Sequence, residues 1–481
     1  MTPKQKRILL VSGSVAVLLV VVITALLLFI NVNVYKPRIE AAASDAIGMD
    51  FKIGGPLRIV LFPRFGVSLG NVLIKKGQLD FLSAEKVRIG LRLFPLIRRE
   101  VRISEFTIIN PKITIERDKN GRFNFEGPMQ KPEKEENLPT VLLTMGSFVI
   151  SKGELVFLDK ISNARTELNG IDLNIKALSF SAERSHSLLR NVSFLGNFQC
   201  KTLKTKDFKA KNIRFDMKGK DGIFDISPIT MNFFGGTEKG AIKADLTGDS
   251  PFLKIQFAAT NFDFEKFVEA FSKKKIMKGQ MDFSLNIVTN GKNLEEMKKR
   301  INGEAFLRGE NLLLYGMDLD SLLSNIEESQ SFSLVDVGAF FLAGPLGTVL
   351  TKGYDFAGVY KETRGGQGII KKLVSEWRIK NGIAEAEDVA LSTKRNRVAM
   401  KGGLDFVNSR FDDVTVAALD EKGCAKFSQK IHGSFRKPQI EKISTLRTIV
   451  GPGVKLFEKA QKFVGWGKCK VFYKGSVKPP V

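Results

Sequence analysis

The chain of 481 residues contains very little histidine, cysteine, tyrosine or tryptophan. Histidine occurs only at His186 and His432, far apart in the chain, so the inventory gives no basis for a histidine-based metal site or a catalytic triad. No Walker A sequence is present, and the glycines at 365–368 lack the strand, spacing and helix of a dinucleotide site. No pair stands out among the 51 acidic residues. The sequence therefore predicts a protein that is not an enzyme and has no metal or cofactor.

Cysteine is scarce, and none precedes Cys200, which excludes a lipid-modified N-terminal cysteine. Cys424 and Cys469 both lie near the C-terminal end, and an oxidising exported compartment favours a disulfide between them. The alternative is two buried free thiols. A helix is predicted between them at 454–464, preceded by Gly and Pro at 451–453. Cys200 is then left single, and we expect it to be buried.

Only one long hydrophobic run is present, at 8–30, and it contains no charged side chain. At 1.5 Å per residue a helix of this length spans about 35 Å, enough for a hydrocarbon core of roughly 30 Å. Lys4, Lys6 and Arg7 precede the run, so the positive-inside rule makes 1–7 a cytoplasmic tail and places the remainder across the membrane. A cleavable signal peptide is the alternative, but its apolar core would span only roughly 7 to 15 residues. An uncleaved single-pass anchor is therefore predicted.

Acidic side chains are outnumbered by basic ones, 51 against 75, and the net charge is +24. The exported topology argues against a nucleic-acid partner and favours anionic lipid headgroups beside the membrane, with a solvated basic face as the alternative.

Among aromatic residues, 38 are Phe against 5 Tyr and 2 Trp. Phe has no polar atom, so this balance favours dry surfaces or contact with an apolar ligand, although a large Phe-rich core would also account for it.

Most of the chain after the apolar run predicts short antiparallel strands, because apolar and polar residues alternate with a period of two. Lys86, Arg88 and Arg92, for example, alternate with apolar neighbours. A strand with this pattern has one apolar and one polar face. The apolar-face positions of the clearest strands are Val87, Ile89, Leu91, Leu93, Ile213, Phe215, Met217, Leu253, Ile255, Phe257, Phe283 and Leu285.

Turn-forming dipeptides support a series of hairpins, since Asn-Gly and Asp-Gly favour tight turns. They are Asn120-Gly121, Asn169-Gly170, Asp221-Gly222, Asn302-Gly303 and Asn381-Gly382. Few helices interrupt the strands. We expect them at 38–46, 264–273, 294–301 and 318–328.

A chain of this length is too long to fold around one ordinary compact core, so we expect either several domains or one elongated architecture. The polar, proline-containing segment 128–140 predicts a linker. It separates a membrane-proximal β module at 31–127 from a central β region at 141–300 and a C-terminal region at 301–481. The apolar stretch 332–350 carries an Asp and a Gly-Pro break, so we expect a buried helix or an amphipathic contact and not a second span.

Several stretches resemble the AsmA family of bacterial inner-membrane anchored proteins. They are YKPRIEAAASDAIGMDFKIGGPLRIVLFPRFGVSLGNVLIKK at 35–76, SKGELVFLD at 151–159, ISPITMNFFGGTEKGAIKADL at 226–246, INGEAFLRGENLLLYGMDLDSLL at 301–323 and IHGSFRKPQI at 431–440. Each is a weak motif of glycines and alternating apolar residues, but their order behind one anchor covers nearly the whole chain. Cys424, Cys469 and the final segment are not features of the best known members.

The resemblance implies a mainly β fold, in which an N-terminal transmembrane helix is followed by an elongated, curved antiparallel sheet with a few short helices. This sheet would form an apolar groove, lined by the apolar-face positions named above. The resemblance places the anchor in the inner membrane of a Gram-negative bacterium and the bulk of the chain in the periplasm. The partners would be phospholipids or other envelope lipids, and the role would be lipid transport toward, or homeostasis of, the outer membrane. A non-catalytic envelope protein that assists outer-membrane protein assembly through protein partners, by strand addition, is the alternative.

Overall fold

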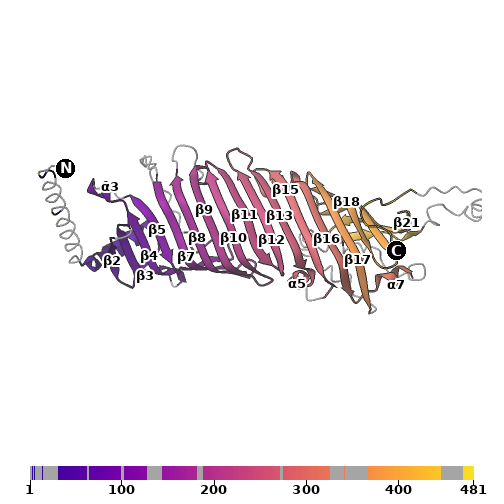
Figure 1. Ribbon diagram of the computed structural model, residues 1–481, viewed down its shortest axis with the longest axis horizontal. Helices are drawn as coiled ribbons and strands as arrows, with labels where there is room; N and C mark the ends of the chain where they lie inside the picture. The colour runs from indigo at the N-terminus through magenta and orange to yellow at the C-terminus, as the bar shows by residue number, and fades with distance from the viewer. Residues whose placement is uncertain are drawn as a thin grey trace, which may run out of the picture. The chain divides into compact units, whose positions relative to one another are not determined.

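The computed structural model describes residues 31–61, 64–77, 79–98, 102–126, 143–180, 188–270, 275–324, 366–445 and 470–480, with a few isolated positions. The chain divides into two units, which we call unit 1 (residues 1–184 and 193–206) and unit 2 (185–192 and 207–481). Strands dominate both units (Figure 1). No helix of the described part of the chain is long and apolar enough to cross a membrane. The predicted anchor at 8–30 lies outside the described residues, apart from position 14.

Unit 1 contains one mixed sheet. Its strands are β1 (Asp50–Ile53), β2 (Leu57–Val60), β3 (Gly66–Lys76), β4 (Leu79–Leu91), β5 (Ile103–Ile109), β6 (Lys112–Arg117), β7 (Leu143–Asp159), β8 (Ala164–Phe180) and most of β9 (Val192–Lys204). β1 and β2 both pair with β3, β3 pairs with β4, and β4 pairs with both β5 and β6. β7 then pairs with β5 and β6 in parallel and with β8 in antiparallel orientation. The prediction of a purely antiparallel sheet was therefore wrong here, because residues 118–142 are a connection long enough to return the chain in the same direction.

Unit 1 also contains η1 (Val32–Tyr35), α2 (Lys36–Ile47) and α3 (Leu93–Ile97). The predicted helix at 38–46 is confirmed as α2, which has a proline in its first turn and ends at Gly48 in the left-handed conformation. Ile39 of α2 packs against the buried residues of β1–β5, and a Glu40 carboxylate oxygen accepts a hydrogen bond of 2.7 Å from the backbone N–H of Ile53. This helix is therefore fastened to the first strand of the sheet.

Unit 2 is an antiparallel meander. Its strands are β10 (Lys209–Lys220), β11 (Ile223–Phe233), β12 (Gly236–Asp245), β13 (Phe252–Asp263), β14 (Met277–Lys278), β15 (Gln280–Asn290), β16 (Asn302–Tyr315), β17 (Gln367–Lys380), β18 (Ile383–Ser392), β19 (Arg397–Asp405), β20 (Arg410–Leu419), β21 (Ala425–Ser434), β22 (Lys437–Ile440) and β23 (Ser444–Thr445). Strands consecutive in sequence pair with each other, except that β13 pairs with β15, β14 with β16, and β23 with β21. Its helices are α4 (Leu188–Asn191), α5 (Phe264–Glu269), α6 (Leu294–Lys299) and α7 (Leu319–Ser324). The last three confirm the helices predicted at 264–273, 294–301 and 318–328, in the part of each range that they span.

Two of the predicted hairpin turns are confirmed, at Asp221-Gly222 between β10 and β11 and at Asn381-Gly382 between β17 and β18. All four residues have positive φ, as the tight hairpin turn requires. Asn120-Gly121 lies in a turn after β6. The turns predicted at Asn169-Gly170 and Asn302-Gly303 were wrong, because both dipeptides lie within strands. Gly170 (φ 66°) is the extra residue of a bulge in β8, and a bulge uses the same left-handed conformation as a turn.

Several predictions concern residues outside the described part of the chain: the linker at 128–140, the helix at 454–464, Cys469 and most of the stretch 332–350. Phe341 is the described position of that stretch, and its side chain is 1% exposed. Its backbone carbonyl accepts a hydrogen bond of 2.9 Å from Ser375 Oγ on β17. This contact places Phe341 against β17, and the expectation for the rest of the stretch stays a prediction.

Candidate functional site

Apolar side chains line up from strand to strand on one face of the unit 1 sheet. One row consists of Ile59 (β2), Val67 (β3), Ile89 (β4), Phe106 (β5), Phe148 (β7) and Ile175 (β8). The neighbouring row consists of Leu57, Leu69, Val87, Ile108, Ile150 and Leu173 on the same strands. Both rows share a face, because side chains two residues apart on a strand point the same way. Two of the predicted positions, Val87 and Ile89, lie in these rows, which we call the apolar face of unit 1.

The other two predicted positions of β4 are placed differently. Leu91 is the last residue of the strand and pairs with Ile103 after a bulge. Leu93 lies in α3, where its side chain is 56% exposed, so the prediction that it continues the strand was wrong. Pro95 lacks a backbone N–H and disfavours a further ladder of hydrogen bonds, so the alternating pattern there does not extend the strand.

Unit 2 has two comparable rows, which we call the apolar face of unit 2. The first consists of Phe215 (β10), Ile229 (β11), Gly240 (β12), Phe257 (β13), Leu285 (β15), Ala305 (β16) and Trp377 (β17). The second consists of Met217, Ile226, Ile242, Ile255, Ile287, Gly303 and Ile379 on the same strands. The register thus brings Phe215, Met217, Ile255, Phe257 and Leu285 together, as predicted from their alternation.

Leu253 and Phe283 lie in rows that flank these two on the same face. The rings of Phe257 and Phe283 are in contact, with centroids 6.2 Å apart. Ile213 and Phe283 are only 8% and 5% exposed, so both belong to the packed interior. They are poorly placed to contact a ligand directly.

Exposure changes along the apolar face of unit 2. On β10–β15 its large side chains, including Phe215, Ile255 and Leu285, are half-buried. On β17 and β19 the corresponding residues are almost completely buried, Trp377 at 1% and Leu404 at 0% exposure. The C-terminal strands therefore enclose a core, whereas β10–β15 leave a continuous apolar surface partly accessible. Contiguous apolar surface of this kind marks a place where a ligand, membrane or protein binds.

The Glu238 side chain interrupts the apolar face of unit 2. On β12 it lies opposite Met231 and Ala259, and it is 0% exposed. Neither carboxylate oxygen has a hydrogen-bond partner among the described residues. Burial raises the pKa of this carboxyl to about 7, with the nearby backbone N–H groups of Phe233 and Glu238 acting in the opposite direction. Glu238 was not predicted as a site residue, although it alternates along β12 with Gly240 and Ile242 of the apolar face, which was the available signal.

The cysteines differ in state. Cys200 is free and buried, as predicted, and burial raises the pKa of its thiol. Cys424 is 3% exposed and disulfide-bonded. Because Cys469 lies outside the described residues, the bridge between Cys424 and Cys469 stays a prediction.

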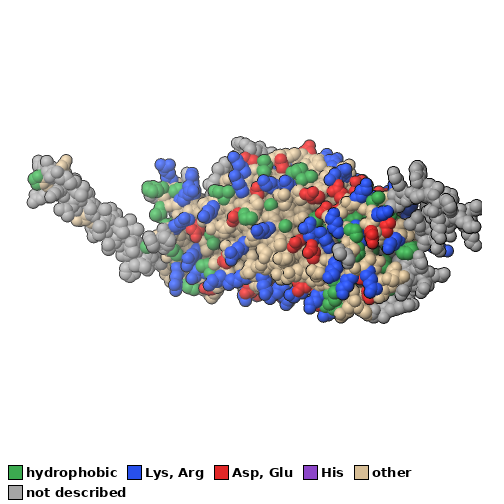
Figure 2. Space-filling model, turned by 45° about the vertical axis from the view of Figure 1, so that its right-hand side comes forward, with side chains coloured by type: hydrophobic (Ala, Val, Ile, Leu, Met, Phe, Trp, Pro, Cys, Tyr) green, Lys and Arg blue, Asp and Glu red, His purple; other side chains and the backbone are tan. Residues whose placement is uncertain are grey.

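The described residues contain no group of His, Cys, Asp and Glu that could hold a metal ion. His432 is placed 3.6 Å from Glu441 at the surface. The visible face of the molecule carries many Lys and Arg side chains, with fewer acidic ones among them (Figure 2). The described residues thus offer apolar surface and positive charge.

These features define a mainly β protein whose sheet exposes continuous apolar rows. A family model described as the AsmA family matches residues 2–208 and 179–388. The chain belongs to the AsmA family, which is not a known enzyme family, and the resemblance in the sequence is confirmed. No significant match was found among curated proteins or among solved structures. Family membership and the large sheet fit a role related to the cell envelope or to lipids.

Proposed function

We propose that this protein binds acyl chains of phospholipids or other envelope lipids on its apolar faces and supports lipid transport toward, or homeostasis of, the outer membrane. The half-buried rows on β10–β15 carry this proposal. Burying one methylene group contributes about 0.8 kcal/mol, so covering six of them on these rows contributes about 5 kcal/mol before ordering costs. The apolar run 8–30 would hold the protein in the inner membrane, with its N-terminus in the cytoplasm and the bulk in the periplasm of a Gram-negative bacterium.

Site-specific photocrosslinking in the intact envelope tests this proposal. The crosslinker is placed at Phe257, which is half-buried on the apolar face, and at Gln256, the exposed next residue on β13, whose side chain leaves the sheet on the opposite face. Mass spectrometry of the adducts is expected to find lipid at Phe257 and none at Gln256. If Phe257 instead traps proteins and never lipid, the protein-partner alternative replaces the lipid proposal.

Substitutions distinguish a ligand surface from a structural core. Leu285→Asp introduces a charge on the half-buried part of the face, where the side chain still reaches water, so the fold is expected to survive while copurified lipid decreases several-fold. Leu404→Asp introduces the same charge at a position with 0% exposure and is expected to unfold unit 2. Lipid mass spectrometry and circular dichroism on the purified full-length chain measure both effects. Unfolding by Leu285→Asp would show that the apolar face is only a core.

A further inference from the structure

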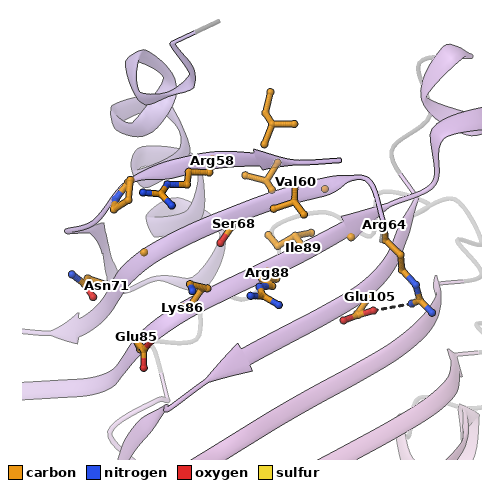
Figure 3. Close-up of a pocket in the computed structure, with 16 residues that line it drawn as sticks. Arg58, Val60, Arg64, Ser68, Asn71, Glu85, Lys86, Arg88, Ile89 and Glu105 are labelled. Atoms are coloured by element: carbon orange, nitrogen blue, oxygen red, sulfur yellow. Dashed lines mark hydrogen bonds and ion pairs between the residues drawn. The ribbon is translucent and has the colours of Figure 1, made fainter. Parts of the chain in front are cut away.

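A pocket of about 720 Å³ lies at β2–β5 of unit 1, and its polar side chains alternate with the apolar rows. Arg58 (β2), Ser68 (β3) and Arg88 (β4) lie side by side in register, one residue away from Ile59, Val67 and Ile89. Because neighbouring residues on a strand point to opposite faces, Arg58, Ser68 and Arg88 leave the sheet on the face opposite to the apolar rows. Figure 3 shows these side chains around the pocket. We call it the basic pocket.

Positive charge in the basic pocket is only partly neutralised. Its charged lining residues are Arg58, Arg64, Lys86, Arg88, Glu85 and Glu105. Arg64 donates to Glu105 over 2.8 Å (Figure 3), and the Glu85 carboxylate accepts a hydrogen bond from the Asn110 side chain. Arg58, Lys86 and Arg88 form no ion pair with any described residue. Several unpaired cations that line one pocket favour a bound anion.

The spacing of these cations suits a small, multiply charged anion. Arg58 and Arg88 are on strands that flank β3, so their backbones lie roughly 10 Å apart, and Lys86 is two residues from Arg88, roughly 7 Å along β4. Long side chains can converge across such distances on one group between them. The guanidinium forks match the paired oxygens of a phosphate, and Lys86 adds a point charge.

The floor and walls of the pocket add a hydroxyl and apolar atoms. Ser68, which is 7% exposed, contributes a hydroxyl that can donate to an anion. Gly66, Gly70 and Gly90 also line the pocket and contribute no side chains, which leaves the space open. Apolar residues such as Val60 complete the lining. An anion that carries a less polar body would therefore use more of this pocket than a bare ion.

We propose that the basic pocket binds a phosphate group, namely that of an anionic glycerophospholipid headgroup. The requirement for phosphate follows from the unpaired cations and their spacing. The assignment of this phosphate to a lipid headgroup rests on the proposed function, together with the apolar part of the lining. The cations of the basic pocket leave the sheet on the side opposite to the apolar rows, because Arg58 and Arg88 alternate with Ile59 and Ile89 along their strands, while Ile59, Val67 and Ile89 themselves also contribute to the lining.

Calorimetric titration of the purified full-length chain in non-ionic detergent tests the proposal with three probes: dihexanoyl phosphatidic acid, dihexanoylglycerol and inorganic phosphate. Arg58→Gln and Arg88→Gln are each expected to weaken phosphatidic acid binding by about 10-fold or more, since each removes charge-assisted hydrogen bonds. Dihexanoylglycerol has no phosphate, so its binding is expected to be unchanged. Arg88→Lys keeps the charge and is expected to retain part of the affinity.

Matched controls remove the same charge elsewhere in unit 1. Arg122→Gln, in the turn after β6, is the control for the arginines, and Lys176→Gln, on β8, is a second control that removes a lysine charge. Neither lines the pocket, and each is expected to change the affinity less than 2-fold. Equal affinity of wild type and the Arg58→Gln/Arg88→Gln variant, or equal losses in the controls, would overturn the proposal.

The three probes also separate the possible bearers of the phosphate. Tighter binding of phosphatidic acid than of inorganic phosphate supports the lipid headgroup, whereas equal binding of the two overturns the lipid assignment in favour of free phosphate. Lipid crosslinking at Phe257 is then measured in the Arg88→Gln variant. Crosslinks that persist there while phosphatidic acid binding is lost show that the two sites are independent, so failure of one proposal is distinguishable from failure of the other.

Discussion

The carboxyl of Glu238 makes the stability of unit 2 depend on pH in a direction opposite to that of most carboxylates. Its pKa is raised from 4.5 to about 7 by burial, and the side chain is 0% exposed. The folded state therefore prefers the protonated form. The contribution of Glu238 to the free energy of unfolding is fully present below pH 4.5, which is the pKa of the unfolded state. It declines as the pH rises and is lost by about pH 7. At 1.36 kcal/mol per pKa unit, the loss is about 3 kcal/mol.

Glu238→Gln tests this reasoning, because glutamine has the shape of the protonated acid and does not ionise. We expect wild type and variant to have similar free energies of unfolding at pH 4.5. At pH 8 we expect the variant to be more stable by about 3 kcal/mol, which raises Tm by roughly 5 °C for a unit of this size. Taking the difference between the two proteins at each pH cancels the titration of all other groups.

The assay is urea or thermal unfolding of the full-length chain in detergent from pH 4.5 to 8. Trp377, buried in unit 2, is the fluorescence reporter in a Trp466→Phe background. Glu385→Gln, an exposed position on β18, is the matched control and is expected to change the free energy of unfolding by less than about 0.5 kcal/mol. A Glu238→Gln difference that does not grow with pH, or a variant less stable throughout, would refute the reasoning.

Further predictions concern ion pairing, core packing and the disulfide. Hydrogen bonds from Arg117 and Ser162 hold the pKa of Asp159 well below its usual range. Arg117→Gln is therefore expected to destabilise unit 1 at neutral pH. In unfolding experiments at a series of pH values, the difference in stability from wild type should fade as the pH falls below 4. Leu404→Ala, at a position with 0% exposure, is expected to cost about 2–5 kcal/mol in denaturant unfolding. Cys424→Ser is expected to cost about 2–4 kcal/mol, and thiol alkylation of the denatured, unreduced wild type should label Cys200 and leave Cys424 unlabelled.

Local sequence patterns determined the strands, their faces and most of the short helices. The alternation around Val87 and Ile89 assigned both to one apolar face, because a side chain's face depends only on its place along its own strand. Asp221-Gly222 specified a hairpin, since its two residues adopt positive φ readily. The helix α2 was predicted at 38–46, and it ends at Gly48 in the left-handed conformation that commonly terminates helices. Each of these features depends on residues that are neighbours in the chain.

Tertiary structure decided the features that depend on which strands become neighbours. The parallel pairing of β7 with β5 and β6 could not be predicted, because strand direction across a long connection depends on where the chain returns. Asn169-Gly170 has the chemistry of a turn, and only the pairing with β7 makes it a bulge. The pattern around Pro95 likewise predicted a longer strand than forms.

The two chemically distinctive places in the protein also depended on tertiary structure. Glu238 is one acidic residue among 51 in the sequence, and the packing of its neighbours is what excludes water from its carboxyl. Arg58 and Arg88 are distant in sequence, and the register of β2, β3 and β4 places them on either side of Ser68. Sequence alone determined that the chain would form strands with one apolar and one basic face. The assembly of strands decided which of those side chains meet, because burial and convergence of charge come from residues that only folding brings together.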